Sequence, residues 1–171
     1  MKTYRPCVGI ALFNNEGLVF AGERVQKRNS WQMPQGGVDR GESVLQAAHR
    51  EMHEETGVKS ASLLAYTDGW LHYEIPSKRG KHRGQKQMWF AFRLEDESQI
   101  NVAQAHAEFS SHCFLPLSQM ESEIISFKKN VYRQVNILFG ALCVNEKLLS
   151  KTPRVSGEAF AQAGSVRALW A

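Results

Sequence analysis

The segment from residue 43 to residue 57 restricts the fold most strongly, because it carries a helix start, an apolar stripe and a helix stop. Ser43 is a residue type that caps helix N-termini, and Gly57 is the type that ends helices. The apolar residues between them recur at helical spacing. The sequence therefore predicts an amphipathic helix over residues 43–56. Its apolar residues are Val44, Leu45, Ala48 and Met52.

Three glutamates crowd the end of this predicted helix, where the helix dipole disfavours negative charge. Glu51 lies three and four residues from Glu54 and Glu55, and such like-charged neighbours repel by roughly 0.2–0.5 kcal/mol per pair. At about 100° per residue, the three side chains share one face of the helix, about 100° wide. His49 and His53 fall on the opposite face, so we predict no zinc site there.

Two interpretations of the glutamates follow. The first is a solvated acidic face, partly neutralised because Arg50 can reach Glu54 along the helix. The second is a site for Mg²⁺ or Mn²⁺, because these cations prefer oxygen ligands. The glycine pair at residues 36–37 favours the second interpretation, since its backbone can approach a ligand closely.

The rest of the chain alternates short apolar segments with polar loops. A second helix is predicted over residues 126–144. This combination predicts an α/β domain with helices packed on a sheet. We place the domain at residues 1–144 and treat residues 145–171 as a C-terminal tail of unknown structure. Strands are predicted at residues 7–13, 18–23, 61–66, 69–75, 86–94 and 111–117.

Composition limits the setting of the protein. No apolar run approaches the ~20 residues needed to span a bilayer, so we expect no membrane partner. The three cysteines are far apart and contain no C-x-x-C pair, which suits free thiols in a reducing cytoplasm. The oligomeric state is left open.

The charges are unevenly distributed. Residues 36–58 contain five acidic and two basic residues, although the whole chain has a net charge of +4. An acidic patch inside a basic protein favours cations at the patch and a polyanion across it. A solvated basic loop is the alternative for the residues of the basic segment, which are Lys78, Arg79, Lys81, Arg83 and Lys86.

From Gly36 the chain reads GGVDRGESVLQAAHREMHEETGV. This stretch resembles the Nudix hydrolase box, G-x5-E-x7-R-E-U-x-E-E-x-G-U, where U is apolar, and it fills every defined position. The resemblance implies an α/β/α sandwich around a mixed sheet. It also implies metal-dependent cleavage of a nucleoside diphosphate linked to another group. Flanking stretches such as SWQMPQGG, GWLHYEIP and RGQKQMWF resemble the bacterial RNA 5′-pyrophosphohydrolases and the related dinucleoside polyphosphate hydrolases.

The resemblance assigns roles to particular residues. It implies two or more Mg²⁺ or Mn²⁺ ions, and a general base chosen, in order of preference, from Glu54, Glu51 and Glu108. Arg50 is expected to orient the glutamates through hydrogen bonds, and Glu42 to have a structural role near the helix start. The implied metal ligands are the Gly36 carbonyl and the side chains of Glu51, Glu54, Glu55 and Glu108.

Substrate contacts are expected from basic and aromatic residues. Tyr73 and Phe139 are candidates to sandwich the first base, although strand and helix aromatics are commonly core residues. Each basic candidate can equally be a surface charge. The candidates for binding the 5′ phosphates are Arg5, Arg24, Lys86 and Lys128.

Three functions are compatible with this pattern. The first is an Mg²⁺-dependent pyrophosphohydrolase that converts 5′-triphosphate or 5′-diphosphate RNA ends to 5′-monophosphate and promotes RNA decay. The second is a dinucleoside polyphosphate hydrolase, such as one acting on diadenosine tetraphosphate. The third is a non-catalytic nucleotide- or RNA-binding module, against which the intact set of glutamates argues.

Overall fold

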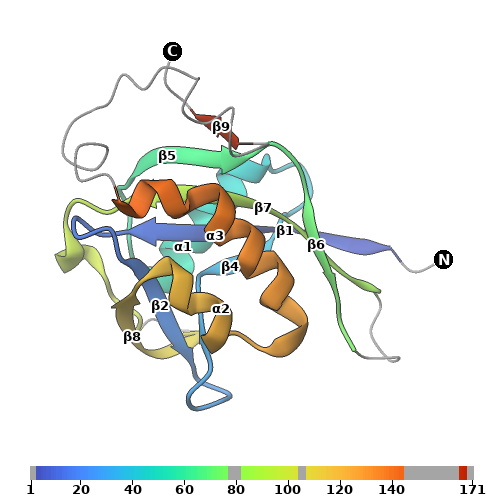
Figure 1. Cartoon of the computed structure of the whole chain (residues 1–171), viewed down its shortest axis with the longest axis horizontal. Helices are drawn as coiled ribbons and strands as arrows, with labels where there is room; N and C mark the ends of the chain where they lie inside the picture. Colours follow the sequence, from blue (N-terminus) through green and yellow to red (C-terminus); the bar gives the residue numbers. More distant parts are fainter. Residues whose placement is uncertain (1–2, 77–81, 104–106, 145–165, 169–171) are drawn as a thin grey trace.

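A computed structural model of the chain describes residues 3–76, 82–103, 107–144 and 166–168 (Figure 1). Lys78, Arg79 and Lys81 of the predicted basic segment lie outside these residues. The elements, in chain order, are β1 (Tyr4–Phe13), β2 (Val19–Arg24), β3 (Trp31–Gln32), β4 (Gln35–Gly37), α1 (Val44–Thr56), β5 (Ser62–Thr67), β6 (Leu71–Glu74), β7 (Gly84–Arg93), a 3-10 turn (Glu97–Gln99), β8 (Phe109–Leu115), a second 3-10 turn (Leu117–Gln119), α2 (Met120–Glu123), a third 3-10 turn (Ser126–Lys128), α3 (Lys129–Val144) and β9 (Val166–Ala168).

The centre of the sheet is a parallel pair of strands, β1 and β7. Their register runs without a break from Tyr4 opposite Gly84 to Phe13 opposite Arg93. The other pairings are antiparallel: β4 joins β1, β5 and β6 join β7, and β8 joins β2. The sheet is therefore mixed, and β4 and β6 flank the same end of its central pair.

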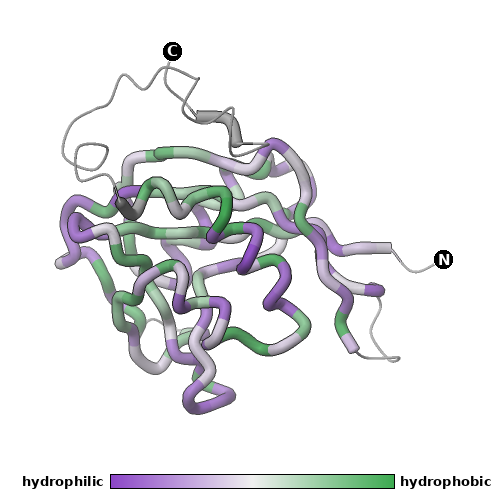
Figure 2. The backbone as a smooth tube through the Cα atoms, in the orientation of Figure 1, coloured by the Kyte–Doolittle hydropathy of each residue, from purple (hydrophilic) through white to green (hydrophobic). Residues whose placement is uncertain are grey.

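Helices cover both faces of this sheet. Figure 1 shows α3 in front of the sheet and α1 behind it. Each helix buries its own apolar cluster: Tyr132 and Phe139 of α3 pack with Trp89 on one face, and Met52 of α1 packs with Phe92 on the other. In Figure 2 the hydrophobic stretches of the tube run along these central elements. The predicted α/β/α sandwich around a mixed sheet is confirmed.

The predicted helix over residues 43–56 is also confirmed, together with its ends. Ser43 accepts a hydrogen bond from the backbone N–H of Gln46, whose side chain in turn accepts from the backbone N–H of Ser43. This reciprocal pair satisfies two N–H groups that the first turn leaves free. Gly57 ends the helix at φ 80°, a left-handed conformation that favours glycine.

The predicted strands all exist, with ends that differ by up to three residues. The second predicted helix divides into the 3-10 turn at Ser126–Lys128 and α3. Helix α2 and strand β9 were not predicted. Helix α3 is described up to Val144, and apart from β9 the residues beyond it lie outside the described part of the chain, so the domain boundary at residue 144 stays a prediction. None of the described helices is long and apolar enough to cross a membrane.

Candidate active site

Helix α1 divides its three glutamates between different surroundings. Glu55 is buried, at 6% exposure, and accepts a hydrogen bond from the backbone N–H of Gln35 at 3.0 Å. The side chain of Glu51 is also mostly buried, whereas that of Glu54 is 56% exposed. Two carboxylates on this helix face, those of Glu51 and Glu55, are therefore buried beside β4, and the third, that of Glu54, is exposed to solvent.

Arg50 ties these glutamates to the loop before the helix. Its guanidinium donates to Glu51 at 2.8 Å, to Glu54 at 3.0 Å and to both carboxylate oxygens of Glu42. It also donates to the backbone carbonyl of Gly37 at 2.8 Å. Arg50 thus makes the hydrogen bonds expected of an orienting residue. Glu42 also accepts from the backbone N–H of Asp39, so it closes the loop at the helix start.

Replacing Arg50 by methionine is expected to destabilise the protein by about 2 kcal/mol in metal-free buffer, because partly buried carboxylates lose their charged donor. Urea unfolding with EDTA present measures this change. The matched control is Arg133→Met, which breaks an exposed pair with Glu121 and is expected to leave the unfolding midpoint unchanged. Equal midpoints for Arg50→Met and the wild type would show that Arg50 does not hold the cluster together.

The backbone at Gly36 lies directly against the carboxylate of Glu51. A Cβ added at Gly36 would overlap that carboxylate, and one added at Gly37 would overlap the guanidinium of Arg5. Two side chains of opposite charge therefore reach the same short strand, β4. Only glycine leaves room for both of them.

A cavity of about 360 Å³ opens beside β4. Its acidic part includes Glu51 and Glu108, and its wall includes Tyr73 and Phe127, whose ring centroids lie 5.6 Å apart. The structure thus brings predicted carboxylates, predicted cations and an aromatic wall into one hollow. The full lining is Arg5, Arg24, Gln32, Gln35, Gly36, Gly37, Glu51, Tyr73, Ile75, Gln85, Glu108, Ile125, Phe127 and Lys128.

Two of the carboxyl groups beside the cavity, those of Glu51 and Glu55, resist ionisation. Burial raises the pKa of Glu51, and the charges of Glu54 and Glu108 raise it further, against the opposing effect of Arg50. Burial also raises the pKa of Glu55 well above its ordinary value, with additional contributions from Glu108 and Glu51. Glu51, Glu55 and Glu108 therefore form one electrostatically coupled group that favours an added cation.

Lys128 is the buried cation of the cavity. It is 6% exposed, and its Nζ lies 5.5 Å from the ring centroid of Tyr73 and 3.5 Å from Oε1 of Gln32. Burial, together with the smaller effect of the Arg24 charge, lowers the pKa of Lys128 to about 8. An anionic ligand placed between Lys128 and Arg24 would reduce this repulsion and stabilise both charges.

The donor set fits a divalent cation that keeps part of its water shell. Among the described residues, no three side chains of His, Cys, Asp or Glu form a ready metal cage. Arg50 instead holds Glu54 outside the cavity lining. Mg²⁺ is commonly bound through one or two carboxylates and several waters, which matches Glu51 and Glu55 beside the backbone of Gly36.

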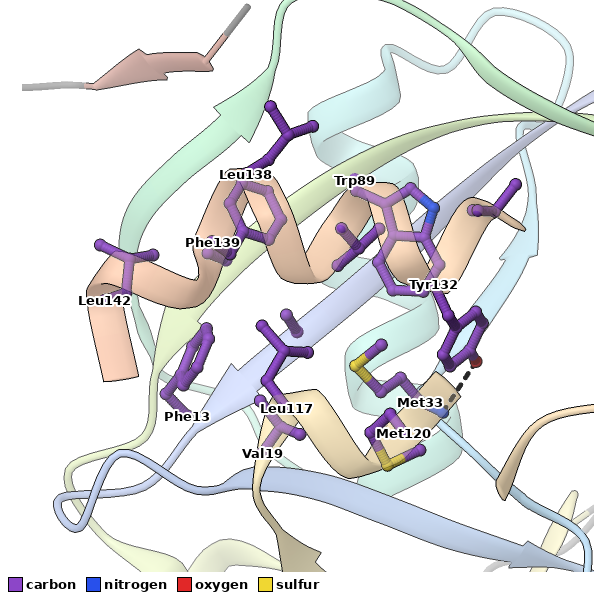
Figure 3. Close-up of a cluster of buried hydrophobic side chains, with 14 of the residues drawn as sticks. Phe13, Val19, Met33, Trp89, Leu117, Met120, Tyr132, Leu138, Phe139 and Leu142 are labelled. Carbon is purple, nitrogen blue, oxygen red and sulfur yellow. Dashed lines mark hydrogen bonds between the residues drawn. The ribbon is translucent and has the colours of Figure 1, made fainter. Parts of the chain in front are cut away.

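Two predicted substrate contacts, Lys86 and Phe139, do not line the cavity. Lys86 lies outside the cavity because side chains alternate along β7: Gln85 lines the cavity, and Lys86 points to the other face of the sheet. There its Nζ lies 4.7 Å from the ring centroid of Trp70. Phe139 is fully buried among core residues of α3 and the sheet, and so it is not placed to stack on a base (Figure 3).

Sequence reasoning missed other residues of the lining. The aromatic residue that packs beside Tyr73 in the cavity wall is Phe127, whereas Phe139 is the residue predicted from the sequence for this role. The sequence did contain a sign that Phe127 lies at the site, because this residue immediately precedes the predicted phosphate ligand Lys128 in the stretch SFKK. Gln32, Gln35 and Gln85 also line the cavity, but a neutral side chain in a strand gives no charge pattern to notice.

The comparisons with known proteins agree with this geometry. Residues 3–135 match the NUDIX domain. The chain is 44% identical over 158 residues to the "RNA pyrophosphohydrolase" of Rhizobium meliloti strain 1021, which covers 81% of this chain and 95% of that protein. It is 46% identical over 151 residues to the protein of the same name from Agrobacterium fabrum, covering 77% and 89% of the two chains.

Solved structures show the same fold at low identity. The dihydroneopterin triphosphate pyrophosphohydrolase of E. coli aligns with a TM-score of 0.59 and 20% identity, over 78% of this chain and 97% of that one. An Ap4A hydrolase of C. elegans aligns with a TM-score of 0.60 and 17% identity, over 80% and 98%. Nudix hydrolases generally use a divalent metal such as Mg²⁺. From its sequence match and its fold, this chain belongs to the Nudix family.

Proposed function

We propose that this protein is an Mg²⁺-dependent RNA pyrophosphohydrolase that converts the 5′-triphosphate or 5′-diphosphate end of RNA to a 5′-monophosphate. Pyrophosphate or orthophosphate is the other product, and the exposed monophosphate end promotes decay of the transcript. This activity places the protein in the cytoplasm, where RNA is made and degraded. The observation that carries the proposal is the cavity that joins carboxylates, cations and an aromatic wall.

Each part of the cavity has a place in this reaction. Arg5, Arg24 and Lys128 are positioned to bind the oxygens of a 5′ polyphosphate through charge-assisted hydrogen bonds. Tyr73 and Phe127 offer an aromatic wall on which a base can stack, a contact worth roughly 1–3 kcal/mol per base and tolerant of sequence. The two curated relatives described above, both named for RNA, favour this substrate over a free nucleotide.

The carboxylates serve the metal and the attacking water. We propose that Glu51, Glu55, Glu108 and the Gly36 carbonyl hold Mg²⁺ or Mn²⁺, in two or more positions, with Glu54 joining them if it leaves Arg50. When bound, such ions neutralise phosphate oxygens and lower the pKa of a bound water. Glu51 and Glu108 line the cavity and Glu54 does not. We therefore rank Glu51 and Glu108 ahead of Glu54 as candidates for the general base.

The test is a comparison of two substrates in Mg²⁺ buffer. One is a short RNA with a 5′ triphosphate, and the other is diadenosine tetraphosphate. We expect kcat/KM to be at least tenfold higher for the RNA, and EDTA to abolish turnover. A preference for the dinucleotide would replace the proposal with a dinucleoside polyphosphate hydrolase. Binding of RNA without turnover of either substrate would favour a non-catalytic module.

The pKa of Glu55 leads to a prediction about metal and pH. A carboxyl whose folded pKa is raised above its ordinary value of 4.5 adds stability that is present below that value and is lost as pH rises through the folded pKa. Mg²⁺ binds the deprotonated carboxylate, so it competes with this proton. The rise in melting temperature caused by Mg²⁺ should therefore be larger at about pH 8 than at about pH 6.

Differential scanning fluorimetry with Mg²⁺ or EDTA measures this difference. In Glu55→Gln the group no longer titrates, so the pH dependence of the Mg²⁺ effect should shrink. An Mg²⁺ effect of the same size at both pH values in the wild type would contradict a role for Glu55 as a ligand.

A further inference from the structure

The floor of the cavity is a row of side chains taken from three neighbouring strands. Gln85 of β7 lies opposite Arg5 of β1 on one side and Tyr73 of β6 on the other. Because alternate strand residues share a face, Gln87 and Trp89 continue this face of β7 into the core. A cavity residue, Gln85, is thus continuous with two fully buried ones, each at 0% exposure.

Trp89 determines which way the amide of Gln87 points. The indole N–H can only donate a hydrogen bond, and Trp89 Nε1 lies 3.1 Å from Oε1 of Gln87. The indole has room to lie here because residue 9 is glycine: a Cβ at that position would overlap the ring of Trp89. The carbonyl of Gln87 therefore faces Trp89, and its amino group faces the cavity side.

The amino group of Gln87 in turn orients two cavity glutamines. It donates to Oε1 of Gln35 at 3.1 Å and to Oε1 of Gln85 at 3.3 Å. The hydroxyl of Tyr73 donates to the same oxygen of Gln85 at 2.6 Å. Both lone pairs of the Gln85 carbonyl are then occupied, and within the described part of the chain no hydrogen bond uses its amino group.

We propose that the amino group of Gln85 binds a phosphate oxygen of the substrate, and that Gln87, fixed by Trp89, is the positioning residue that turns it toward the cavity. The proposal rests on the proposed function, because the phosphate belongs to the 5′ polyphosphate. An anionic oxygen is the matching acceptor, since Arg5 lies beside Gln85 in the adjacent strand and also lines the cavity.

The experiment is a double-mutant cycle with 5′-triphosphate RNA and saturating Mg²⁺. Gln85→Met removes the donor and is expected to raise KM about tenfold while kcat stays within about twofold. Gln87→Met should raise KM in the same direction. The double variant should be no worse than Gln85→Met alone, because Gln87 acts through Gln85.

The matched control is Gln134→Met on α3, outside the cavity lining, which should leave KM unchanged. An unchanged KM in Gln85→Met would overturn the proposal. So would additive effects in the double variant, because these would mean that Gln87 acts independently of Gln85.

Wild-type protein provides a second measurement if Gln87→Met does not fold. Side-chain amide signals of ¹⁵N-labelled glutamine are followed while inorganic tripolyphosphate is added in EDTA, with Gln85 assigned by its absence in Gln85→Met. The Gln85 signals should shift on binding. If tripolyphosphate binds and shifts other cavity signals but not these, the proposal is overturned.

Failure of this inference is distinct from failure of the proposed function. A wild-type enzyme that cleaves diadenosine tetraphosphate but not RNA would refute the function. The same glutamine variants would then be measured on the tetraphosphate, which carries an equivalent polyphosphate.

Discussion

Glu51→Gln is expected to lower kcat by about 10³-fold, the largest effect of any single change discussed for this protein. Glu51 lines the cavity and lies against the backbone of Gly36. The negative charge of Glu108 raises the pKa of Glu51. The amide keeps the shape of the side chain but removes the charge that a metal ion requires. Steady-state turnover of 5′-triphosphate RNA measures the loss.

The fold should survive this substitution. Glutamine also removes a charge whose burial is unfavourable, so we expect a stability change of roughly 1 kcal/mol or less, which is about 2–4 °C in melting temperature for a domain of this size. The matched control is Glu16→Gln, an exposed glutamate in the β1–β2 hairpin, which should retain full activity. Retention of more than a tenth of wild-type kcat in Glu51→Gln would remove Glu51 from the metal site.

Gly36→Ala is expected to lower kcat/KM by about 10²-fold and also to destabilise the fold. Its Cβ would overlap the carboxylate of Glu51, so either that side chain or β4 must move. Misplacement of a catalytic group by about 1 Å can cost a factor of 10², and overpacking costs typically 1–3 kcal/mol. Kinetics and thermal unfolding of the same preparation measure both effects.

Gly69→Ala is the matched control, because a Cβ at that position would meet no atom within 4 Å. It should change neither activity nor melting temperature. If Gly36→Ala kept wild-type kinetics, the close approach of Glu51 to this backbone would be irrelevant to catalysis.

The sequence predicted the parts of the site that depend on local spacing. Residues of one helix turn must share a face, so Glu51 and Glu55 could be placed together without knowledge of the rest of the chain. The capping residue Ser43 and the terminator Gly57 act through their immediate neighbours for the same reason. These features are confirmed because no distant contact is needed to set them.

The predicted residues that lie outside the cavity are ones whose side-chain direction depends on packing. Lys86 and Gln85 are adjacent in sequence, and only the register of β7 against β1 and β6 decides which of them faces the cavity. Phe127 and Phe139 belong to the same segment, but the 3-10 turn before α3 directs Phe127 to the cavity and leaves Phe139 in the core. Glu54 lies outside the cavity, unlike Glu51, and it is bound there by Arg50. The Nudix motif predicts that an arginine stands at residue 50, but it does not predict where its side chain points.

The parallel pairing of β1 with β7 has a consequence for how the enzyme is made. It joins Tyr4 to Gly84, and the cavity also needs Lys128, so its walls come from most of the folded chain. Contacts this distant in sequence form late, after long loops have closed. A growing chain released from the ribosome before the start of α3 would have the acidic helix but no complete cavity. Catalytic competence is therefore a property that this protein acquires only after the segment that carries Lys128 has been synthesised.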